Sequence, residues 1–152
     1  MKLVVQRVSR ANVSVDGNIC GEIKKGYMIL VGVVEGDTLD DVDILARKVA
    51  NLRVFEDENG KMNLDIKQVD GEILAISQFT LCADLRKGNR PSFIDSAEPT
   101  LANEYYEIFC QKLLENGVKN VEKGIFGADM KVDLVNDGPV TIIYDSEIWR
   151  KK

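Results

Sequence analysis

The sequence of 152 residues contains no histidine and only three cysteines. The missing imidazole excludes Ser-His-Asp and Cys-His catalysis, and it excludes every zinc site that relies on histidine. Cys20, Cys82 and Cys110 form no C-x-x-C pair, which predicts reduced, mostly buried thiols and argues against a structural zinc site. We therefore expect no metal and no cofactor, and a chemistry run by carboxylates, hydroxyls, amides, backbone groups or the substrate itself.

Long apolar runs are also missing. The longest, Tyr27 to Val34, has the length of a strand and falls well short of the ~20 residues that a membrane helix needs. Arg7 and Arg10 interrupt the N-terminal stretch, which is unlike the apolar centre of a signal peptide. We expect a cytoplasmic protein that does not associate with membranes.

The chain has little excess of basic charge anywhere, and its net charge is −5. A protein that coats nucleic acid usually has a basic face, so the composition argues against DNA binding and against broad RNA binding. Two basic stretches remain, L-R-K-G-N-R at Leu85 to Arg90 and W-R-K-K at Trp149 to Lys152. Both are consistent with ordinary solvated surface, and a small contact with one end of a nucleic acid stays open.

Turn signals and side-chain periodicity predict a single α+β domain spanning residues 1–152, with a mainly antiparallel or mixed, barrel-like sheet and two main helices. One helix is expected from an N-cap at Asp37-Thr38 to about Leu52, and the other from Pro99 to Asn116-Gly117. No strand, Gly-rich loop and helix follow one another as in a nucleotide-binding fold. Strands are predicted over residues 2–9, 11–15, 19–23, 26–34, 53–55, 72–82, 121–126, 130–135 and 140–144.

The predicted strand I-L-A-I-S-Q-F-T-L-C changes abruptly from apolar to polar at Ser77. Strand alternation would place Ser77 and Phe79 on one face, with Gln78 and Thr80 on the other. Polar groups within an apolar strand need partners or a pocket, so this stretch is either a strand end in solvent or a pocket rim. A nucleophilic Ser77 or Thr80 would need a base beside it, and no acid or lysine lies within three residues of either.

A Gly-Pro pair precedes the last predicted strand, in V-N-D-G-P-V-T-I-I-Y-D. Gly138 can adopt backbone angles that are costly for other residues, and Pro139 has a fixed φ and no N–H group. The pair is either an ordinary turn or a rigid backbone element that contacts a ligand. Similarly, Phe126 and Met130 flank Gly127-Ala128 and are either core residues or parts of a loop that closes on a ring.

Six of these stretches, in register along the chain, give the sequence a resemblance to the D-aminoacyl-tRNA deacylases. The two signature motifs of that family are similar to S-Q-F-T-L and N-D-G-P-V-T here. The matching stretches are Gln6–Val8, Asn51–Phe55, Ser77–Leu81, Arg90–Phe93, Gly124–Met130 and Asn136–Thr141. The resemblance covers nearly the whole chain.

The resemblance implies an enzyme that hydrolyses the ester of D-aminoacyl-tRNA, and of glycine mischarged onto tRNA, while rejecting L-aminoacyl-tRNA. It implies a homodimer with active sites at the interface, in which a cis Gly138-Pro139 peptide reaches into the partner's pocket. The hypothesis is that the ribose 2′-hydroxyl of the tRNA assists the reaction. Two alternatives remain: a general esterase with a Thr80 nucleophile, and a dimeric binding module without catalysis.

The resemblance also implies a role for each candidate residue. Ser77, Gln78, Phe79 and Thr80 would orient the ester carbonyl and stabilise its charge. Gly138 and Pro139 would contact the amino acid, and Phe126 and Met130 the adenosine. The remaining expected roles are bracing of the Gly-Pro loop by Arg7 and Asn136, and weak contacts with tRNA phosphates by Arg86, Lys87 and Arg90.

Overall fold

The fold is organised around one long strand, β1 (Lys2–Val15), which pairs antiparallel with three others: β2 (Asn18–Ile23), β3 (Gly26–Gly32) and β8 (Lys131–Asp145). This computed structural model describes residues 1–150, so the end of the basic tail expected at Trp149 to Lys152 lies outside the described residues. The remaining elements are α1 (Leu39–Ala50), β4 (Phe55–Glu56), β5 (Met62–Leu64), β6 (Glu72–Ser77), the 3-10 turn η1 (Phe79–Cys82), α2 (Pro99–Glu115), β7 (Val121–Lys123) and the 3-10 turn η2 (Ser146–Trp149).

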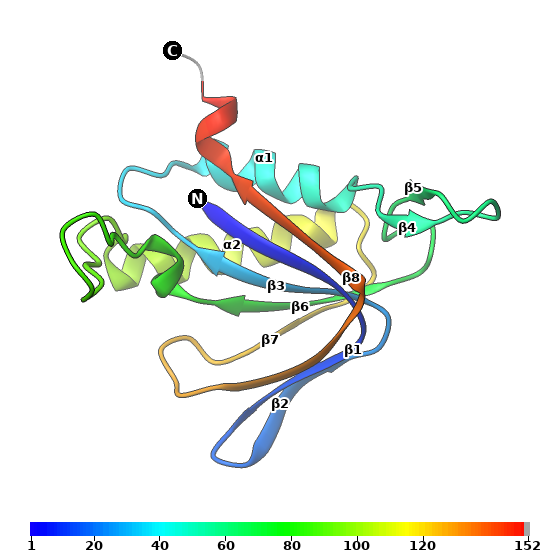
Figure 1. The fold of residues 1–152 in the computed structure, drawn as a ribbon, viewed down its shortest axis with the longest axis horizontal. Helices are drawn as coiled ribbons and strands as arrows, with labels where there is room; N and C mark the ends of the chain where they lie inside the picture. Colours follow the sequence, from blue (N-terminus) through cyan, green and yellow to red (C-terminus); the bar gives the residue numbers. More distant parts are fainter. Residues whose placement is uncertain (151–152) are drawn as a thin grey trace.

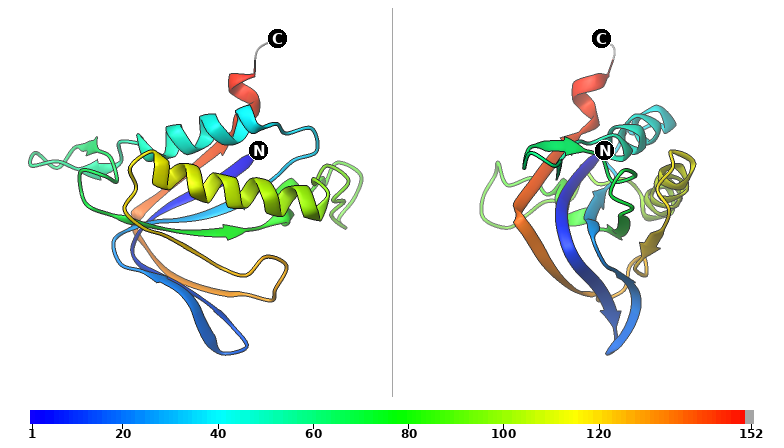
Figure 2. Two further views of the ribbon diagram at one scale, coloured as in Figure 1. Left: turned by 180° about the vertical axis from the view of Figure 1, so that it is seen from behind. Right: turned by 90° about the vertical axis from the view of Figure 1, so that its right-hand side faces the viewer.

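The main sheet is mixed and strongly curled. Its strand order is β2-β1-β3-β6-β7, with β8 on the other edge of β1, and the β3–β6 and β6–β7 pairs are parallel. Figure 2 shows β8, β1 and β2 curving away from the two helices, so that the sheet nearly closes into a barrel. The α+β class, the mixed barrel-like sheet and the two helices are as the sequence predicts.

The buried apolar side chains form two main cores and a small third cluster of Val33, Ala97 and Ala102. The two helices lie together on one side of the sheet (Figure 1). The largest core lies between them and the sheet, where Leu45, Phe109 and Leu113 are fully buried. The smaller core lies inside the curl, where Val8, Val13 and other apolar side chains of the sheet pack together. The candidate pocket described below opens at the end of the sheet at which β6 stops.

Both helices begin and end close to the predicted residues. Thr38 is the N-cap of α1 and forms a capping box with Asp41. Pro99 occupies the first turn of α2, and the side chain of Glu98 caps that helix by accepting from the Thr100 N–H at 3.1 Å. In the described part of the chain, no helix is long and apolar enough to cross a membrane.

Several strand predictions need correction. The strand expected to reach Cys82 ends at Ser77, because the chain turns into η1, so Ser77, Gln78, Phe79 and Thr80 do not alternate across a sheet. The strand expected over 121–126 stops at Lys123, where β7 leaves β6. The strands predicted over 2–9 and 11–15 are one continuous strand, β1, and those predicted over 130–135 and 140–144 are one continuous strand, β8. Both remain continuous because the β1–β8 ladder accommodates its register shifts without ending either strand.

The Gly-Pro pair lies in a bulge of β8. Gln6 of β1 pairs with Thr141 and Val8 pairs with Asn136, so the single residue Arg7 faces four residues of β8. An insertion of this kind disrupts the ladder locally and pushes the extra residues out of the sheet. The residues from Asp137 to Pro139 are accordingly exposed.

Candidate active site

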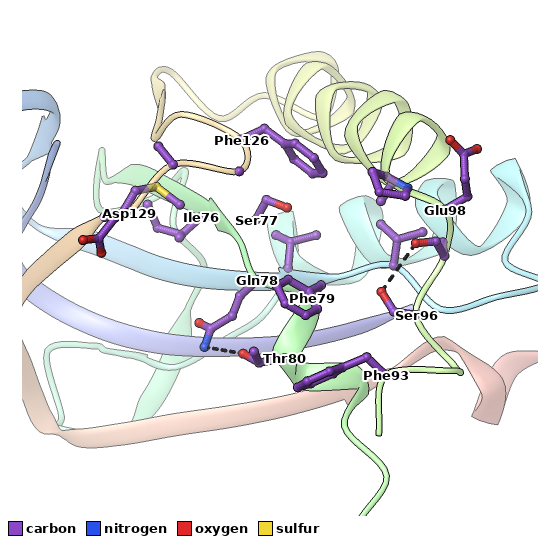
Figure 3. Close-up of a pocket in the computed structure, with 18 of the residues that line it drawn as sticks. Ile76, Ser77, Gln78, Phe79, Thr80, Phe93, Ser96, Glu98, Phe126 and Asp129 are labelled. Atoms are coloured by element: carbon purple, nitrogen blue, oxygen red, sulfur yellow. Dashed lines mark hydrogen bonds between the residues drawn. The ribbon is translucent and has the colours of Figure 1, made fainter. Parts of the chain in front are cut away.

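A cavity of about 1040 Å³ opens beside the end of β6, at the upper limit of what a small-molecule site typically has (Figure 3). Its walls come from β3, the β6–η1 segment, the start of α2 and the loop before β8. The lining residues are Val31, Val33, Ile76, Ser77, Gln78, Phe79, Thr80, Phe93, Ser96, Ala97, Glu98, Pro99, Ala102, Phe126, Gly127, Ala128, Asp129, Met130 and Val132.

One wall is the turn from β6 into η1. The apolar residues before Ser77 are buried in the sheet, and the N–H of Gln78 donates to the Val31 carbonyl at 2.7 Å. The turn then packs directly on Gly32 of β3: a Cβ at Gly32 would lie 2.9 Å from the Leu81 Cβ and 3.3 Å from the Gln78 carbonyl oxygen. Glycine at position 32 therefore allows η1 to sit close enough to β3 to form the pocket wall.

The polar groups of this wall are an amide, two hydroxyls and backbone N–H groups. The Gln78 Nε2 donates to the Thr80 Oγ1 at 2.9 Å, while the half-buried Ser77 lies between Phe126 and Phe79 in Figure 3. Within residues 1–150, the backbone N–H groups of Phe79 and Thr80 donate to no protein acceptor, as expected for the first residues of a helical turn. This arrangement provides hydrogen-bond donors for a carbonyl oxygen.

Aromatic rings line two sides of the cavity. Phe79 packs edge-on against Phe93, with ring centroids 4.9 Å apart and an interplanar angle of 70°. Phe79 is still 56% exposed, which is unusual for a ring of its size. Phe126 faces the cavity from the opposite wall in Figure 3, on the loop that also carries Met130. The site can therefore hold a flat apolar group beside polar donors.

The wall that sequence reasoning missed consists of residues 96–99 and the first turn of α2. The Ala97 N–H donates to the Val33 carbonyl at 3.0 Å, which fastens this segment to the end of β3. The only signal in the sequence is Pro99 as a helix start, and nothing in its position shows that this helix end faces Ser77. Phe93 belongs to one of the matching stretches but was not predicted to line a pocket.

Few groups of the pocket can titrate. Glu98 and Asp129 are its charged lining residues, and the Glu98 carboxylate is occupied as the cap of α2. Burial raises the pKa of the thiol of Cys82, the last residue of η1, and this thiol donates to the Val33 carbonyl at 3.5 Å. Across the described residues 1–150, no group of three or more His, Cys, Asp or Glu side chains is placed to hold a metal ion.

The Gly138-Pro139 peptide is cis and does not line this cavity in its own chain. Its bulge is held from within the protein. The buried Arg7 donates from Nε to the Asp137 carbonyl at 3.0 Å and from Nη1 to the Val54 carbonyl at 2.7 Å. The Asn136 Oδ1 accepts from the Val140 N–H at 3.1 Å. The bulge is thus a fixed, exposed backbone element.

The basic loop after η1 is exposed, and it closes on itself through the antiparallel bridge between Asp84 and Ser92. Arg86 donates to both oxygens of Asp84, at 3.0 and 2.8 Å, and these hydrogen bonds lower the pKa of Asp84 to about 2. Arg86 is therefore engaged within the protein, whereas Lys87 and Arg90 are exposed and point to no acidic partner among the described residues.

The fold and the cavity define a single-domain α+β protein with an open, largely apolar site lined by hydroxyl, amide and backbone donors.

Residues 4–145 match the family described as D-Tyr-tRNA(Tyr) deacylase. One similar solved structure is that of a "c-Myc DNA Unwinding Element Binding Protein": it is 41% identical, with a TM-score of 0.90 over 95% of this chain and 98% of the other. Another, described as a probable eukaryotic D-amino acid tRNA deacylase, has the same fold at 14% identity, with a TM-score of 0.81 over 94% and 97% of the two chains.

The chain belongs to the D-Tyr-tRNA(Tyr) deacylase family. It is a D-aminoacyl-tRNA deacylase, a hydrolase of the ester between the amino acid and the tRNA. The alternative of a binding module without catalysis is thereby set aside.

Proposed function

We propose that this deacylase selects D-aminoacyl-tRNA by chirality, and that the Gly138-Pro139 bulge of one protomer forms the selective wall of the pocket of a second. The observation that carries the proposal is the bulge itself: it is exposed and firmly held, yet it lines no part of its own chain's cavity. A rigid backbone element of this kind is suited to a neighbouring molecule. A homodimer would bring the two signature segments, Ser77–Leu81 and Asn136–Thr141, to one site.

Chiral selection calls for a stiff wall. Rejecting the L-ester by about 10⁴-fold takes roughly 5.5 kcal/mol, whereas one methylene in an apolar pocket discriminates by only ~1–3 kcal/mol. Arg7 and Asn136 hold the bulge, and its backbone carbonyls can occupy the space that an L side chain needs. Glycine has no side chain to exclude, so glycyl-tRNA is expected to be a substrate too.

The chemistry that the pocket supports is water attack on an ester whose carbonyl oxygen is held by donors. The unpaired N–H groups of Phe79 and Thr80 are suited to that oxygen as it becomes negative, and Ser77 and Gln78 lie beside them. No histidine exists to serve as a base. We infer that the 2′-hydroxyl of the terminal ribose, next to the ester, positions the attacking water.

A general esterase with Thr80 as nucleophile is the competing mechanism. The Thr80 hydroxyl accepts a hydrogen bond from Gln78, a neutral amide that cannot take its proton. The charged residues of the pocket, Glu98 and Asp129, come from other walls, and Glu98 already caps α2. The geometry therefore favours assistance from the substrate.

The tRNA contact is proposed to be small and to involve the acceptor end, with Lys87 and Arg90 near phosphates and Arg86 held back by Asp84. Because few phosphates are contacted and the net charge is −5, tRNA binding should depend only weakly on salt.

The protein of the 41% identical structure is named for DNA binding. The same salt titration with duplex DNA tests whether this chain shares that property; we expect no binding. Aminoacyl-tRNA as substrate is in keeping with a cytoplasmic location, which stays a prediction.

The test is a deacylation assay with four substrates at equal concentration: D-tyrosyl-tRNA, L-tyrosyl-tRNA, glycyl-tRNA, and D-tyrosyl-tRNA ending in 2′-deoxyadenosine. We expect rapid loss of the D and glycyl esters, no loss of the L ester, and about 100-fold slower loss from the 2′-deoxy substrate. Equal loss of D and L esters would overturn the chiral wall. Normal turnover of the 2′-deoxy substrate would overturn assistance by the 2′-hydroxyl.

A further inference from the structure

The pocket exists because the sheet divides at one point. β6 pairs with β7 from Ile73 to Ala75, and the last pair is Ala75 with Lys123. Beyond it the two chains separate. Ile76 and Ser77 form one wall of the cavity, and the loop leading to Met130 forms the opposite wall. Whatever fixes the separation point therefore sets the width of the pocket.

A buried tyrosine of α2 occupies this point. The Tyr106 hydroxyl, on a side chain that is only 1% exposed, donates to the Ala75 carbonyl at 2.6 Å. Ala75 is the last residue of β6 that pairs with β7, so the hydroxyl binds β6 at the point where the two chains begin to separate. Burial and the nearby Cys110 and Glu107 raise the pKa of Tyr106, so the hydroxyl stays protonated and remains a donor at neutral pH.

Two further contacts hold the diverging loop at this place. A Cβ at Gly124 would lie 2.5 Å from the Met130 Sδ and 3.3 Å from the Ile76 Cδ1, so the loop folds closely over Gly124. Lys123 forms an ion pair with Glu107 of α2, with Nζ and Oε2 2.7 Å apart. That pair is exposed and contributes little by itself, whereas the hydrogen bond of Tyr106 to Ala75 is buried.

We propose that Tyr106 is a positioning residue of the deacylase: its hydroxyl fixes the Ala75 carbonyl at the last β6–β7 pair. It thereby sets the point at which the Gly124–Met130 loop departs, and with it the position of the Phe126–Met130 wall that the substrate requires. This inference rests on the proposed function of the pocket. Tyr106 touches no reacting atom. Its effect is on substrate binding, through the loop.

Tyr106→Phe tests the inference, because it keeps the ring in the core and removes only the hydroxyl. The matched control is Tyr144→Phe. Tyr144 is another buried tyrosine, and its hydroxyl donates to the Lys48 carbonyl at 3.3 Å, away from the pocket. We expect Tyr106→Phe to raise KM for D-tyrosyl-tRNA about tenfold with kcat changed less than about twofold, which corresponds to about 1.4 kcal/mol of lost binding. Tyr144→Phe should change neither constant by more than about twofold.

A second measurement does not depend on activity. Hydrogen exchange of the amides from Ile125 to Met130 should accelerate in Tyr106→Phe and remain unchanged in Tyr144→Phe. Equal exchange and equal KM in the two variants would overturn the inference. If the unsubstituted protein deacylates nothing while exchange still accelerates in Tyr106→Phe alone, the proposed function fails and the structural role of Tyr106 stands.

Discussion

The two signature segments of the chain, Ser77–Leu81 and Asn136–Thr141, have opposite construction. The first is a strand end that turns into η1, where Phe79 and Thr80 line the cavity and their backbone N–H groups have no protein acceptor among the described residues. The second is a bulge whose backbone is held by Arg7 and Asn136, and whose exposed tip does not line that cavity in its own chain. The first segment therefore has donors without acceptors beside the cavity, whereas the backbone of the second is held by side chains and lies away from it.

If the proposed dimer divides the site between two protomers, this difference shows how such a division can be recognised in a single chain. A receiving segment shows unsatisfied donors beside a cavity, and a presenting segment shows a firmly held backbone at the surface. The predictions below test that division, beginning with the largest expected effect.

Gly138→Ala should abolish most of the activity. Gly138 has φ +134, which L side chains rarely adopt, and its Cβ would lie 2.8 Å from the Val140 Cγ2 and 3.1 Å from the Arg7 Nη2. The bulge must shift, and a displacement of ~1 Å costs about 100-fold in rate. We expect kcat/KM for D-tyrosyl-tRNA to fall by about that factor while circular dichroism remains unchanged.

Gly17→Ala is the matched control for this substitution. Gly17 also has positive φ, +81, but a Cβ there has no atom within 4 Å. It lies in the turn between β1 and β2, where Asp16 has positive φ as well. Activity should be retained within about twofold, and a loss equal to that of Gly138→Ala would mean that backbone strain alone, wherever it occurs, explains the result.

Arg7→Met should lower both stability and activity. The substitution keeps an apolar stem but removes the hydrogen bonds to the Asp137 and Val54 carbonyls. Because charged donors contribute more than neutral ones, we expect the free energy of unfolding to fall by about 2–3 kcal/mol. Urea denaturation measures this. At a temperature where the variant is folded, kcat/KM should fall about tenfold, and unchanged activity would show that the bulge needs no support from Arg7.

Thr80→Ala should have a smaller effect, because the proposed contribution of Thr80 is its backbone N–H and not a nucleophilic hydroxyl. The substitution removes the acceptor of the Gln78 amide and leaves the backbone donor in place. We expect kcat to fall less than about tenfold, the usual size of one neutral hydrogen bond. A loss of about 10³-fold in a folded variant would restore Thr80 as the nucleophile.

Replacing Lys87 and Arg90 by alanine should have the smallest effect. Both side chains are exposed, and each neutralises at most one phosphate. The slope of log K against log salt for tRNA binding should decrease by about one unit per residue that contacts a phosphate. Arg86→Ala serves as the comparison, since Arg86 is paired with Asp84 and should change the slope less.

The sequence predicted the fold class and the helix ends because capping residues, turn glycines and apolar periodicity act locally. The prediction failed where the end of an element depends on contacts with residues far away in the sequence. Nothing near Cys82 shows that β6 stops at Ser77, since the stop depends on η1 packing on Gly32 of a different strand. The hydrogen bond of Tyr106 to Ala75, where β6 and β7 separate, likewise could not be predicted from the sequence.

The candidate site shows the same limit. The polar residues at the end of an apolar strand left a pocket rim and a strand end in solvent as alternatives, and the family resemblance favoured the pocket. Ser77, Gln78, Phe79 and Thr80 do line the cavity with Phe126 and Met130, while their roles stay predictions. The wall made by residues 96–99 was missed, because its approach to Ser77 is a property of how α2 lies on the sheet. The sequence also could not show that Arg86, a predicted phosphate contact, is paired with Asp84, because the pairing depends on how the two side chains are oriented.

The hydrogen bonds by which Arg7 braces the bulge affect which positions tolerate substitution. Arg7 binds main-chain carbonyls, those of Asp137 and Val54, and a carbonyl is the same chemical group whichever residue carries it. The exposed position 137 can therefore accept many replacements without weakening the brace, whereas position 7 depends on a guanidinium that reaches two acceptors at once. A mutational scan would find one tolerant and one intolerant residue joined by a single hydrogen bond.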